Sequence, residues 1–189
     1  MFLGRSGAGK GTQLKLLETY LNTQGKKTIY VSIGELLRTL AKKDTFAGRK
    51  VKSIITEGKL IDEWVAAYLW QNDIMTRLLE NDAFLFFDGS PRKLHEAEAL
   101  DMTLEWFERA KEMVAVLLDV GHEEVFGRLK ARGREDDTEH GIKSRLDWFE
   151  TEVMPVVRYY ESSGRLISVH GEGTIEEVQA RIRTALGVE

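Results

Sequence analysis

The sequence predicts an α/β fold in which a doubly wound parallel sheet of about five strands is flanked by helices. Short apolar runs alternate along the chain with longer stretches of helical periodicity, which is the pattern of βαβ units. Two of the runs are apolar at every position, as in strands that are covered on both faces. The 189 residues include only two prolines and no internal repeat or linker, so we expect one domain with two polar excursions.

Apolar runs mark the expected strands. The two uninterrupted runs are 83–87 and 113–118, and 28–31 is a third run, rich in β-branched residues. Residues 166–169 form the last expected strand and residues 1–3 the first. Since a strand usually has about five residues, either the first strand begins further upstream or it is unusually short.

Helical periodicity fills the spaces between these runs. Leu14, Leu17 and Leu21 recur at the spacing of one buried helix face. The last helix opens with a capping box, in which Thr174 and Glu177 each satisfy a backbone N–H. The residues expected to be buried in that helix are Ile175, Val178, Ile182 and Leu186. The other expected helices are 35–43, 50–57, 63–79, 94–109, 122–132 and 141–161.

Bulk composition argues against several classes of protein. The net charge of −4 disfavours broad nucleic-acid binding, and the apolar runs are far too short to span a bilayer. The chain has no cysteine and no N-terminal signal segment, so we expect a cytoplasmic protein without disulfides or thiolate metal ligands. The arginines nevertheless cluster, with Arg128, Arg132 and Arg134 inside seven residues, which indicates a small, highly charged substrate.

A glycine-rich loop lies between the first expected strand and the first expected helix. Gly4 to Lys10 fits the pattern G-x-x-x-x-G-K, in which glycines let backbone N–H groups surround phosphate oxygens. The following helix directs the positive end of its dipole at the same oxygens, and the lysine reaches the β- and γ-phosphates. Gly11 stands where such loops commonly have a hydroxyl ligand for Mg²⁺, and the hydroxyl comes one residue later, at Thr12. Any Mg²⁺ must therefore be held mainly by phosphate oxygens, water and another acid.

Five blocks of sequence resemble the adenylate kinase family, in the family's order and over essentially the whole chain. The first is Gly7-Ala8-Gly9-Lys10-Gly11-Thr12-Gln13, in which a glycine between Lys and Thr is usual for that family. The other four are Ser32-Ile33-Gly34-Glu35-Leu36-Leu37-Arg38, Gly58-Lys59-Leu60-Ile61, Asp88-Gly89-Ser90-Pro91-Arg92 and Arg132-Gly133-Arg134-Glu135-Asp136-Asp137. The resemblance implies a P-loop NTPase fold with a small helical insertion that binds the nucleoside monophosphate, at about 32–61, and a short lid, at about 132–140. The core would then be 1–31, 62–131 and 141–189.

The resemblance assigns the ATP side of the reaction to the loop and to arginines around the lid. Phosphoryl transfer requires mainly positioning and charge stabilisation of the equatorial oxygens, which guanidinium groups supply. Without the family context, the same charges would indicate a solvated helix surface. The residues implied to bind ATP are Gly7, Ala8, Gly9, Lys10, Gly11, Thr12 and, packed on the adenine, Arg128. Those implied to act in catalysis are Lys10, Arg92, Arg132, Arg134 and Arg145.

One acid is implied to hold the Mg²⁺ that accompanies ATP. Asp88 directly follows an apolar run, and the resemblance makes it a ligand of the metal through water. Its competing role is to cap the turn beside Gly89. The long lid of some relatives, which can carry zinc, is absent, and no cysteine exists to build it, so we expect no structural metal.

The acceptor is expected at the carboxyl ends of the strands, where doubly wound sheets bind their ligands. Arg38 follows a helix start and Arg92 follows a tight turn, and guanidinium forks suit phosphate oxygens bidentately. By resemblance both grip the acceptor phosphate, although Arg38 taken alone fits a solvated helix face equally well. The residues implied to bind the nucleoside monophosphate are Ser32, Ile33, Arg38, Lys59, Ile61, Gly89, Arg92 and Glu96.

Two acceptor positions depart from the family pattern. Ile33 stands where adenylate kinases usually have Thr, and Glu96 stands where they have a Gln that both accepts from and donates to the adenine edge. An ionised Glu can only accept, for example from the exocyclic amine of adenine or cytosine. Backbone groups of 59–61 are expected to supply the rest of the selectivity. AMP is the preferred acceptor, and the alternative is UMP, CMP or another small molecule.

The sequence therefore predicts a monomeric kinase that transfers the γ-phosphoryl group of Mg·ATP to AMP and binds neither nucleic acid nor membrane. The rival from another class is a nucleotide switch without catalysis, which would not need Arg38, Arg92 and the lid arginines together. Glycines near the insertion and the lid indicate that both close to exclude water. The sequence does not explain Arg5 and Ser6, where relatives often carry Ala-Pro.

Overall fold

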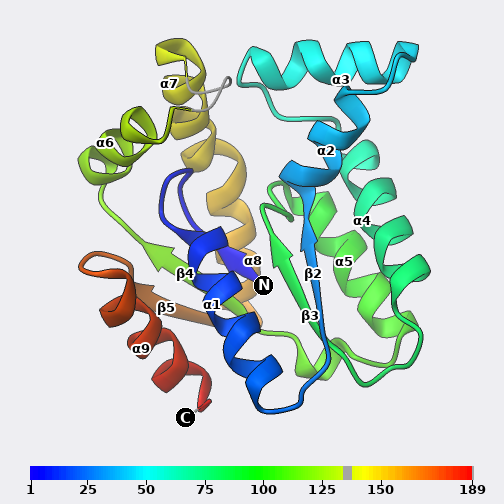
Figure 1. Ribbon diagram of the computed structural model, residues 1–189, viewed down its shortest axis with the longest axis vertical. Helices are drawn as coiled ribbons and strands as arrows, with labels where there is room; N and C mark the ends of the chain where they lie inside the picture. Colours follow the sequence, from blue (N-terminus) through cyan, green and yellow to red (C-terminus); the bar gives the residue numbers. More distant parts are fainter. Residues whose placement is uncertain (134–137, 189) are drawn as a thin grey trace.

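The computed structural model describes residues 1–133 and 138–188. In these residues a five-stranded parallel sheet has the strand order β2-β3-β1-β4-β5, with helices on both faces (Figure 1). The strands are β1 (Phe2–Leu3), β2 (Thr28–Ser32), β3 (Phe84–Asp88), β4 (Ala115–Asp119) and β5 (Leu166–His170). The predicted α/β fold is thereby confirmed, including its parallel sheet.

The central strand is short but well paired. β1 has two residues, yet Phe2 is paired with Asp88 of β3 on one side and with Val116 of β4 on the other. β2 and β3 run in register as far as Ser32 and Asp88. Their carboxyl ends therefore lie together, at the edge of the sheet where the phosphate loop leaves β1.

Helices connect the strands. Those before β4 are α1 (Lys10–Thr23), α2 (Ile33–Ala41), α3 (Phe46–Thr56), α4 (Glu63–Arg77), α5 (Leu94–Trp106) and the short 3₁₀ helix η1 (Ala110–Glu112). Those after it are α6 (His122–Arg132), α7 (Glu139–Trp148), the π-helix η2 (Phe149–Val153), α8 (Met154–Ser162) and α9 (Ile175–Leu186). No helix in the described ranges is long and apolar enough to cross a bilayer.

Two hydrophobic clusters lie on opposite faces of the sheet, because successive strand residues point to opposite sides. Phe2 and Phe86 belong to the cluster under α1, α6, α7 and α9, whereas Leu3 and Phe87 belong to the cluster under α4, α5 and α8. The predicted stripe of α1 is confirmed, since Leu14, Leu17 and Leu21 are all buried.

Three sequence predictions were wrong in detail. The helix predicted at 141–161 is divided into α7, η2 and α8, because Pro155 has no N–H to donate in the first turn of α8 and the helix opens into a π-turn before it. Residues 113–118 do not form a strand throughout, since β4 begins at Ala115 after η1. Ile175 is 50% exposed at the start of α9, although Thr174 and Glu177 form the expected capping box.

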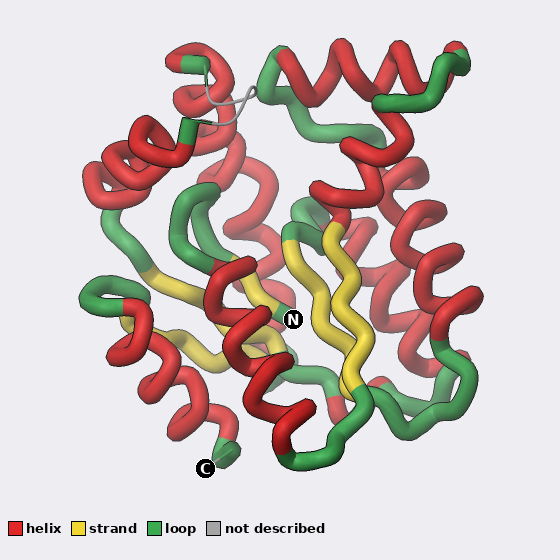
Figure 2. Tube along the Cα trace, in the orientation of Figure 1, coloured by secondary structure: helices red, strands yellow, loops and turns green. Residues whose placement is uncertain are grey.

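Two pairs of helices extend beyond the carboxyl ends of the strands. Figure 2 shows α2 and α3 on one side of this edge and α6 and α7 on the other, with the loops after the strands between them. α2 and α3 pack on each other, and α6 packs on α7. The sheet thus presents its loops to a space that two helical pairs flank.

Candidate active site

The phosphate loop joins β1 to α1 and packs closely on α6. Gly7 has a positive φ of 87°, and a Cβ at this position would lie 2.9 Å from the backbone oxygen of Val125. The same Cβ would lie 2.9 Å from Cγ of Leu129. Glycine is therefore required at this position both for its backbone conformation and for the close approach of the loop to the helix.

Lys10 occupies the interior of the loop. Its Nζ donates to two backbone carbonyls of the same loop, each at 2.8 Å. Burial lowers the pKa of Lys10 to about 8; the charge of Asp88 opposes this shift, and the charges of Arg92 and Arg132 reinforce it. A partly dehydrated ammonium group attracts a phosphate more strongly than one in bulk water.

Asp88 ends β3 beside the first turn of α1. The Tyr30 hydroxyl, from the neighbouring β2, donates to Oδ2 of Asp88 at 2.7 Å. Burial, followed by the charge of Asp88, raises the pKa of Tyr30, so the phenol remains a hydrogen-bond donor. A Cβ on Gly11 would lie 3.0 Å from the same Oδ2, so a side chain after the lysine would crowd the carboxylate.

The carboxylate of Asp88 is suited to a metal that arrives with its nucleotide. No group of three or more His, Asp or Glu side chains in the described residues could enclose a metal ion. Mg²⁺ commonly binds one or two carboxylates together with substrate phosphates and water. The partly exposed Asp88, beside the phosphate loop, fits that kind of coordination.

Arg92 lies at the meeting point of several charged groups. Burial lowers the pKa of its guanidinium, the carboxylates of Glu96 and Asp88 oppose the shift, and the nearby charges of Arg145 and Arg38 reinforce it. Arg92 in the turn after β3 is therefore close enough to Arg38 of α2 and Arg145 of α7 for their positive charges to repel its own. Such a concentration of positive charge attracts anions, and a phosphate is the anion that guanidinium groups bind best.

Small residues make room for these arginines. A Cβ on Gly89 would stand 3.1 Å from Nη2 of Arg92 and 3.1 Å from Cγ2 of Ile33. Arg38 folds back over its own helix, with Nη1 3.2 Å from the position of a Cβ on Gly34. Ser32 is the N-cap of that helix and accepts a hydrogen bond from the backbone N–H of Glu35.

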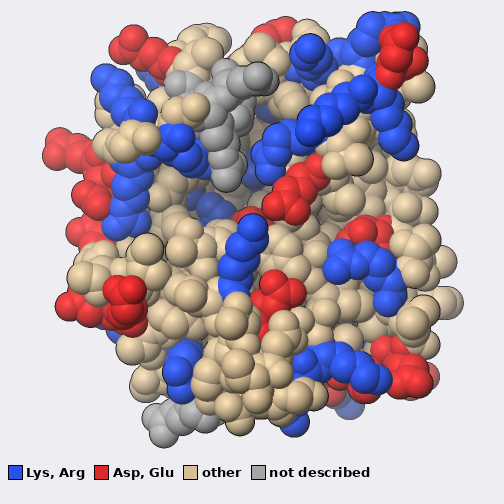
Figure 3. Space-filling view, viewed as in Figure 1, with Lys and Arg blue, Asp and Glu red and all other residues tan. Residues whose placement is uncertain are grey.

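The remaining arginines come from α6 and α7. Arg128 donates to Glu124 at 2.8 Å, and its Nη1 lies 4.0 Å from the position of a Cβ on Gly9 of the phosphate loop. Arg145 is 7% exposed on α7, and Arg132 ends α6. Figure 3 shows Lys and Arg side chains on both sides of the hollow in the upper half of this face. Arg134, with residues 135–137, lies outside the described residues.

Comparison with known proteins identifies the family. A family model described as "Adenylate kinase" matches residues 2–165. The chain belongs to the adenylate kinase family. An adenylate kinase of Thermus thermophilus is 38% identical over 193 residues, which cover 100% of this chain and 96% of the relative. That of Prochlorococcus marinus strain MIT 9211 is 34% identical over 190 residues, with the same coverage, and "Adenylate kinase 1" of Nostoc sp. strain PCC 7120 is 34% identical over 99% of this chain and 97% of the relative.

Glu96, one of the departures from the adenylate kinase pattern, is held by the turn that carries Arg92. It is 3% exposed, and its Oε2 accepts from the Ser90 hydroxyl at 2.8 Å and from the backbone N–H of Arg92 at 3.1 Å. Burial raises the pKa of Glu96 and the charge of Glu63 adds to the rise, whereas the two hydrogen bonds and the Arg92 charge oppose it. Its carboxylate thus stabilises the turn in this structure.

The side chains of three other predicted acceptor residues are engaged in packing or in an ion pair. Ile33 and Ile61 are buried in the hydrophobic core. Lys59 is exposed and forms an ion pair with Glu57 at 2.6 Å. The assignment of these three residues to the site stays a prediction.

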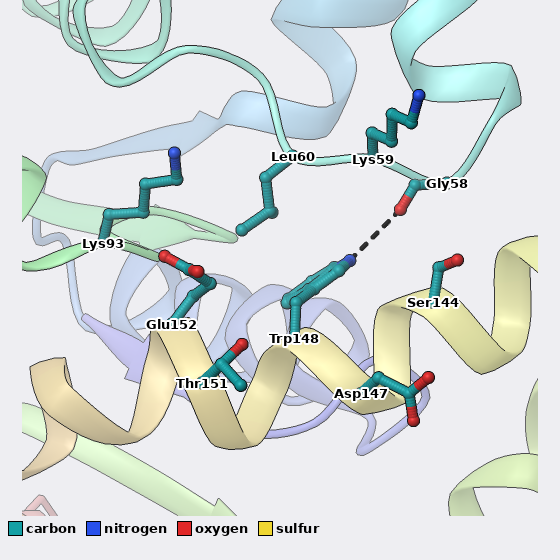
Figure 4. A pocket seen from close by; sticks show the side chains of 9 residues that line it. All are labelled: Gly58, Lys59, Leu60, Lys93, Ser144, Asp147, Trp148, Thr151 and Glu152. Carbon is teal, nitrogen blue, oxygen red and sulfur yellow. Dashed lines mark hydrogen bonds between the residues drawn. The ribbon is translucent and has the colours of Figure 1, made fainter.

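Trp148 joins the two sides of the adenylate kinase site and was missed by sequence reasoning. Its Nε1 donates to the carbonyl of Gly58 at 3.1 Å, and the Arg92 guanidinium lies over its ring at 5.1 Å. A Cβ on Gly58 would lie 2.7 Å from Cα of Gly141, so the insertion and α7 touch at this point. Trp148 lines a pocket of about 420 Å³, and the phosphate-loop residues are not among the residues that line it. Figure 4 shows this pocket from close by, with the bond from Trp148 to Gly58.

Tyr30 was also missed by sequence reasoning. The sequence places it in a short strand rich in β-branched residues, where nothing marks a functional side chain. Only the pairing of β2 with β3 reveals that its hydroxyl reaches Asp88.

Proposed function

We propose that this protein is an adenylate kinase, which transfers the γ-phosphoryl group of Mg·ATP reversibly to AMP and produces two ADP. The observation that carries the proposal is the convergence of Lys10, Asp88 and Arg92 beside one phosphate loop, with further arginines from both flanking helical pairs. The relatives reported above are all named adenylate kinase, whereas the UMP/CMP kinase and the non-catalytic switch gain no support from them.

Each charged group has a separate task in this proposal. Lys10 and the N–H groups of the loop bind the β- and γ-phosphates of ATP. Arg38 and Arg92 bind the acceptor phosphate, since a guanidinium offers two parallel donors to phosphate oxygens. The arginines proposed to stabilise the transferring phosphoryl group are Arg92, Arg132, Arg134 and Arg145.

Bound Mg²⁺ supplies neutralisation of phosphate charge, and Asp88 would hold it through water. The Tyr30 hydroxyl restrains the carboxylate on the side of β2. Gly11 leaves space for the carboxylate next to α1. These contacts support a defined position of Asp88 when the nucleotide binds.

We propose that the insertion, about 32–61, and the lid, about 132–140, close over the two nucleotides. Closure would exclude water, which otherwise competes with AMP for the phosphoryl group. The contact of Gly58 with Gly141 and Trp148 places the insertion against α7, directly after the lid, which supports a coupling of the two movements through this helix. An ATP hydrolysis rate without acceptor that equals the transfer rate would refute this part of the proposal.

The decisive experiment is a set of initial rates with Mg·ATP against AMP, CMP, UMP, GMP and dAMP. We expect rapid ADP formation with AMP and its loss in Arg92→Ala. The matched control is Arg158→Ala, which removes an exposed arginine from α8 and should retain the activity. A preference for CMP or UMP would favour the alternative acceptor. If folded, ATP-binding protein transferred phosphate to no acceptor, the nucleotide switch without catalysis would be the remaining function.

We also propose a cytoplasmic monomer that requires neither nucleic acid nor membrane. The proposal follows from the composition and from the family resemblance. Light scattering coupled to size-exclusion chromatography tests the oligomeric state, and a mass of about twice 21.5 kDa would contradict it.

A further inference from the structure

Arg5 belongs to the phosphate loop but makes its contacts outside it. Nη1 donates to the backbone carbonyl of Val120 at 3.2 Å, and Nη2 donates to Oε1 of Glu150 at 2.5 Å. The guanidinium also lies over the ring of Phe149, 4.6 Å from its centroid. The side chain is 22% exposed, so these contacts are partly shielded from solvent. One guanidinium therefore links the loop to two other segments of the chain.

These two segments are the ends of one structural unit. Val120 lies between β4 and α6, the helix that carries Arg128 and Arg132. Phe149 and Glu150 begin η2, which follows α7, the helix that carries Arg145. The unit formed by α6 and α7 is thus joined to the rest of the domain at two junctions, and Arg5 contacts both. Figure 1 shows the phosphate loop, in dark blue, between the end of β4 and the helix that continues from α7 to α8.

Regular secondary structure is interrupted at both junctions. One junction is the π-turn η2, and π-turns within helices occur frequently at functional sites. The other junction passes from β4 through Gly121, the N-cap of α6, whose backbone N–H donates to Oε1 of Glu172 at 2.9 Å. A rotation at either junction would break a contact of Arg5, because its planar guanidinium holds all three partners in fixed directions.

We propose that Arg5 is a positioning residue that keeps the phosphate loop aligned with the unit of α6 and α7, so that the arginines of this unit meet the phosphates bound in the loop. This inference rests on the function proposed above, but Arg5 is not among the residues proposed to bind the nucleotides or to act in catalysis. The guanidinium of Arg5 is already used by Val120, Phe149 and Glu150, and its role is therefore exerted through the helices that they belong to.

The test compares Arg5→Met, Arg5→Lys, Glu150→Gln and the double variant Arg5→Met/Glu150→Gln. The control is Lys27→Met, which removes the ion pairs of Lys27 with Glu80, at 2.9 Å, and with Asp82, at 2.7 Å, before β2. For each protein we would measure the Kd of Mg·ATP by calorimetry, kcat and KM with AMP, and Tm. Hydrogen exchange with and without Mg·ATP would report the protection of α6 and α7.

A small misplacement of catalytic groups can lower a rate by about 100-fold, so we expect Arg5→Met to lower kcat about 10- to 100-fold. The Kd of Mg·ATP should rise by a smaller factor than kcat falls, since the loop itself remains intact and only the contacts from α6 and α7 are weakened. Arg5→Lys should recover part of kcat because it keeps the charge opposite Glu150. The double variant should be no slower than Arg5→Met. Mg·ATP should protect α6 and α7 from exchange in the natural protein and fail to do so in Arg5→Met.

Three results would overturn the inference. Unchanged kcat and unchanged protection in folded Arg5→Met would show that the contacts have no functional effect. A large loss of ATP affinity in Arg5→Met, with Glu150→Gln unaffected, would make Arg5 a direct phosphate ligand. A loss of kcat in proportion to a lowered Tm, with no recovery in Arg5→Lys, would leave only a structural role. If the natural protein transferred phosphate to no acceptor, the proposed function would fail, and the exchange experiment would still decide the role of Arg5.

Discussion

The donor and acceptor sides of the site contain the same kinds of group but differ in how closely they follow the family pattern. On the donor side, Lys10 lies inside a glycine loop whose backbone approaches α6 at Gly7. On the acceptor side, Arg92 keeps the expected position, but Glu96 is buried and hydrogen-bonded to the turn. Phosphate recognition depends on backbone shape and charge, which short motifs encode, whereas base selectivity depends on the packing of single side chains.

Removal of the loop ammonium should have the largest effect and should affect both halves of the reaction. We expect Lys10→Met to lower kcat/KM for Mg·ATP about 10³-fold, because a preorganised charge at the transferring phosphoryl group is lost. The effect should be the same with AMP or dAMP as the acceptor. Steady-state rates with both acceptors measure it, and a loss confined to one acceptor would contradict a donor-side role.

The same substitution should stabilise the fold at neutral pH. The pKa of Lys10 is about 8 in the folded protein, against 10.5 for a lysine that is not buried, so burial disfavours the charged form. The unfolded state therefore binds more protons between these values, and the contribution of Lys10 to the free energy of unfolding rises with pH across this window. Lys10→Met should raise the free energy of unfolding at pH 7 by at most about 3 kcal/mol. The gain is reduced by the loss of the two hydrogen bonds from Lys10 to backbone carbonyls. Urea denaturation should show a smaller difference in the free energy of unfolding between the variant and the natural protein at pH 10 than at pH 7. A difference that grows with pH would refute the lowered pKa of Lys10.

The pH dependence of the donor side is the next largest effect. Because the ammonium of Lys10 loses its proton above about pH 8, kcat/KM for Mg·ATP should fall about tenfold per unit beyond that pH. Bound phosphates favour the charged form, so kcat should remain level to a higher pH. A pH series of initial rates on the natural protein and on Lys10→Met measures both, and the variant should not show the decline.

The fold and the donor side were largely predictable because both follow from local patterns. The alternation of apolar runs predicted the parallel sheet, and the loop pattern predicted the glycine loop between β1 and α1 that surrounds Lys10. The division of the helix at 141–161 was not predicted, although Pro155 was visible in the sequence. Its apolar periodicity continued on both sides of the proline and hid the π-turn.

The residues that connect separate segments were not predictable. Tyr30 reaches Asp88 only because β2 and β3 are neighbours in register. Trp148 contacts Gly58 only because the insertion meets α7, and Arg5 acquires its partners from two junctions distant in sequence. Contacts of this kind depend on tertiary arrangement, and no spacing within one segment encodes them.

Loss of the Tyr30 hydroxyl should have an intermediate effect at the boundary between the two sides. A hydrogen bond to a charged group contributes about 1.5–3 kcal/mol, so Tyr30→Phe should raise the Mg²⁺ concentration for half-maximal activity about tenfold. The KM for AMP should stay within about twofold, because the acceptor arginines keep their partners. Titration of activity with Mg²⁺ at fixed ATP measures the change. Thr28→Val, which removes another hydroxyl of β2 that binds Asn22, is the matched control.

The smallest expected effect lies on the acceptor side, at Glu96. Glutamine could keep the bonds from Ser90 and Arg92 through its amide oxygen and would add an N–H₂ donor. A donor next to the carboxamide oxygen suits the adenine edge, so Glu96→Gln should raise kcat/KM for AMP about threefold, or about 0.6 kcal/mol. The KM for Mg·ATP should not change, and Glu98→Gln, at the exposed residue paired with His95, should leave both constants unaltered.

The opposite outcome at Glu96 would also be informative. If Glu96→Gln folds normally but lowers kcat about tenfold or more with every acceptor, the negative charge is needed to hold Arg92 against the charges of Arg38 and Arg145. Base selectivity would then reside in the backbone of 59–61, and the acceptor side would depend on charge as strongly as the donor side. Rates of Glu96→Gln with AMP and with CMP distinguish a lost base contact from a displaced arginine. A lost base contact alters the ratio of the two rates, whereas a displaced arginine lowers both rates equally.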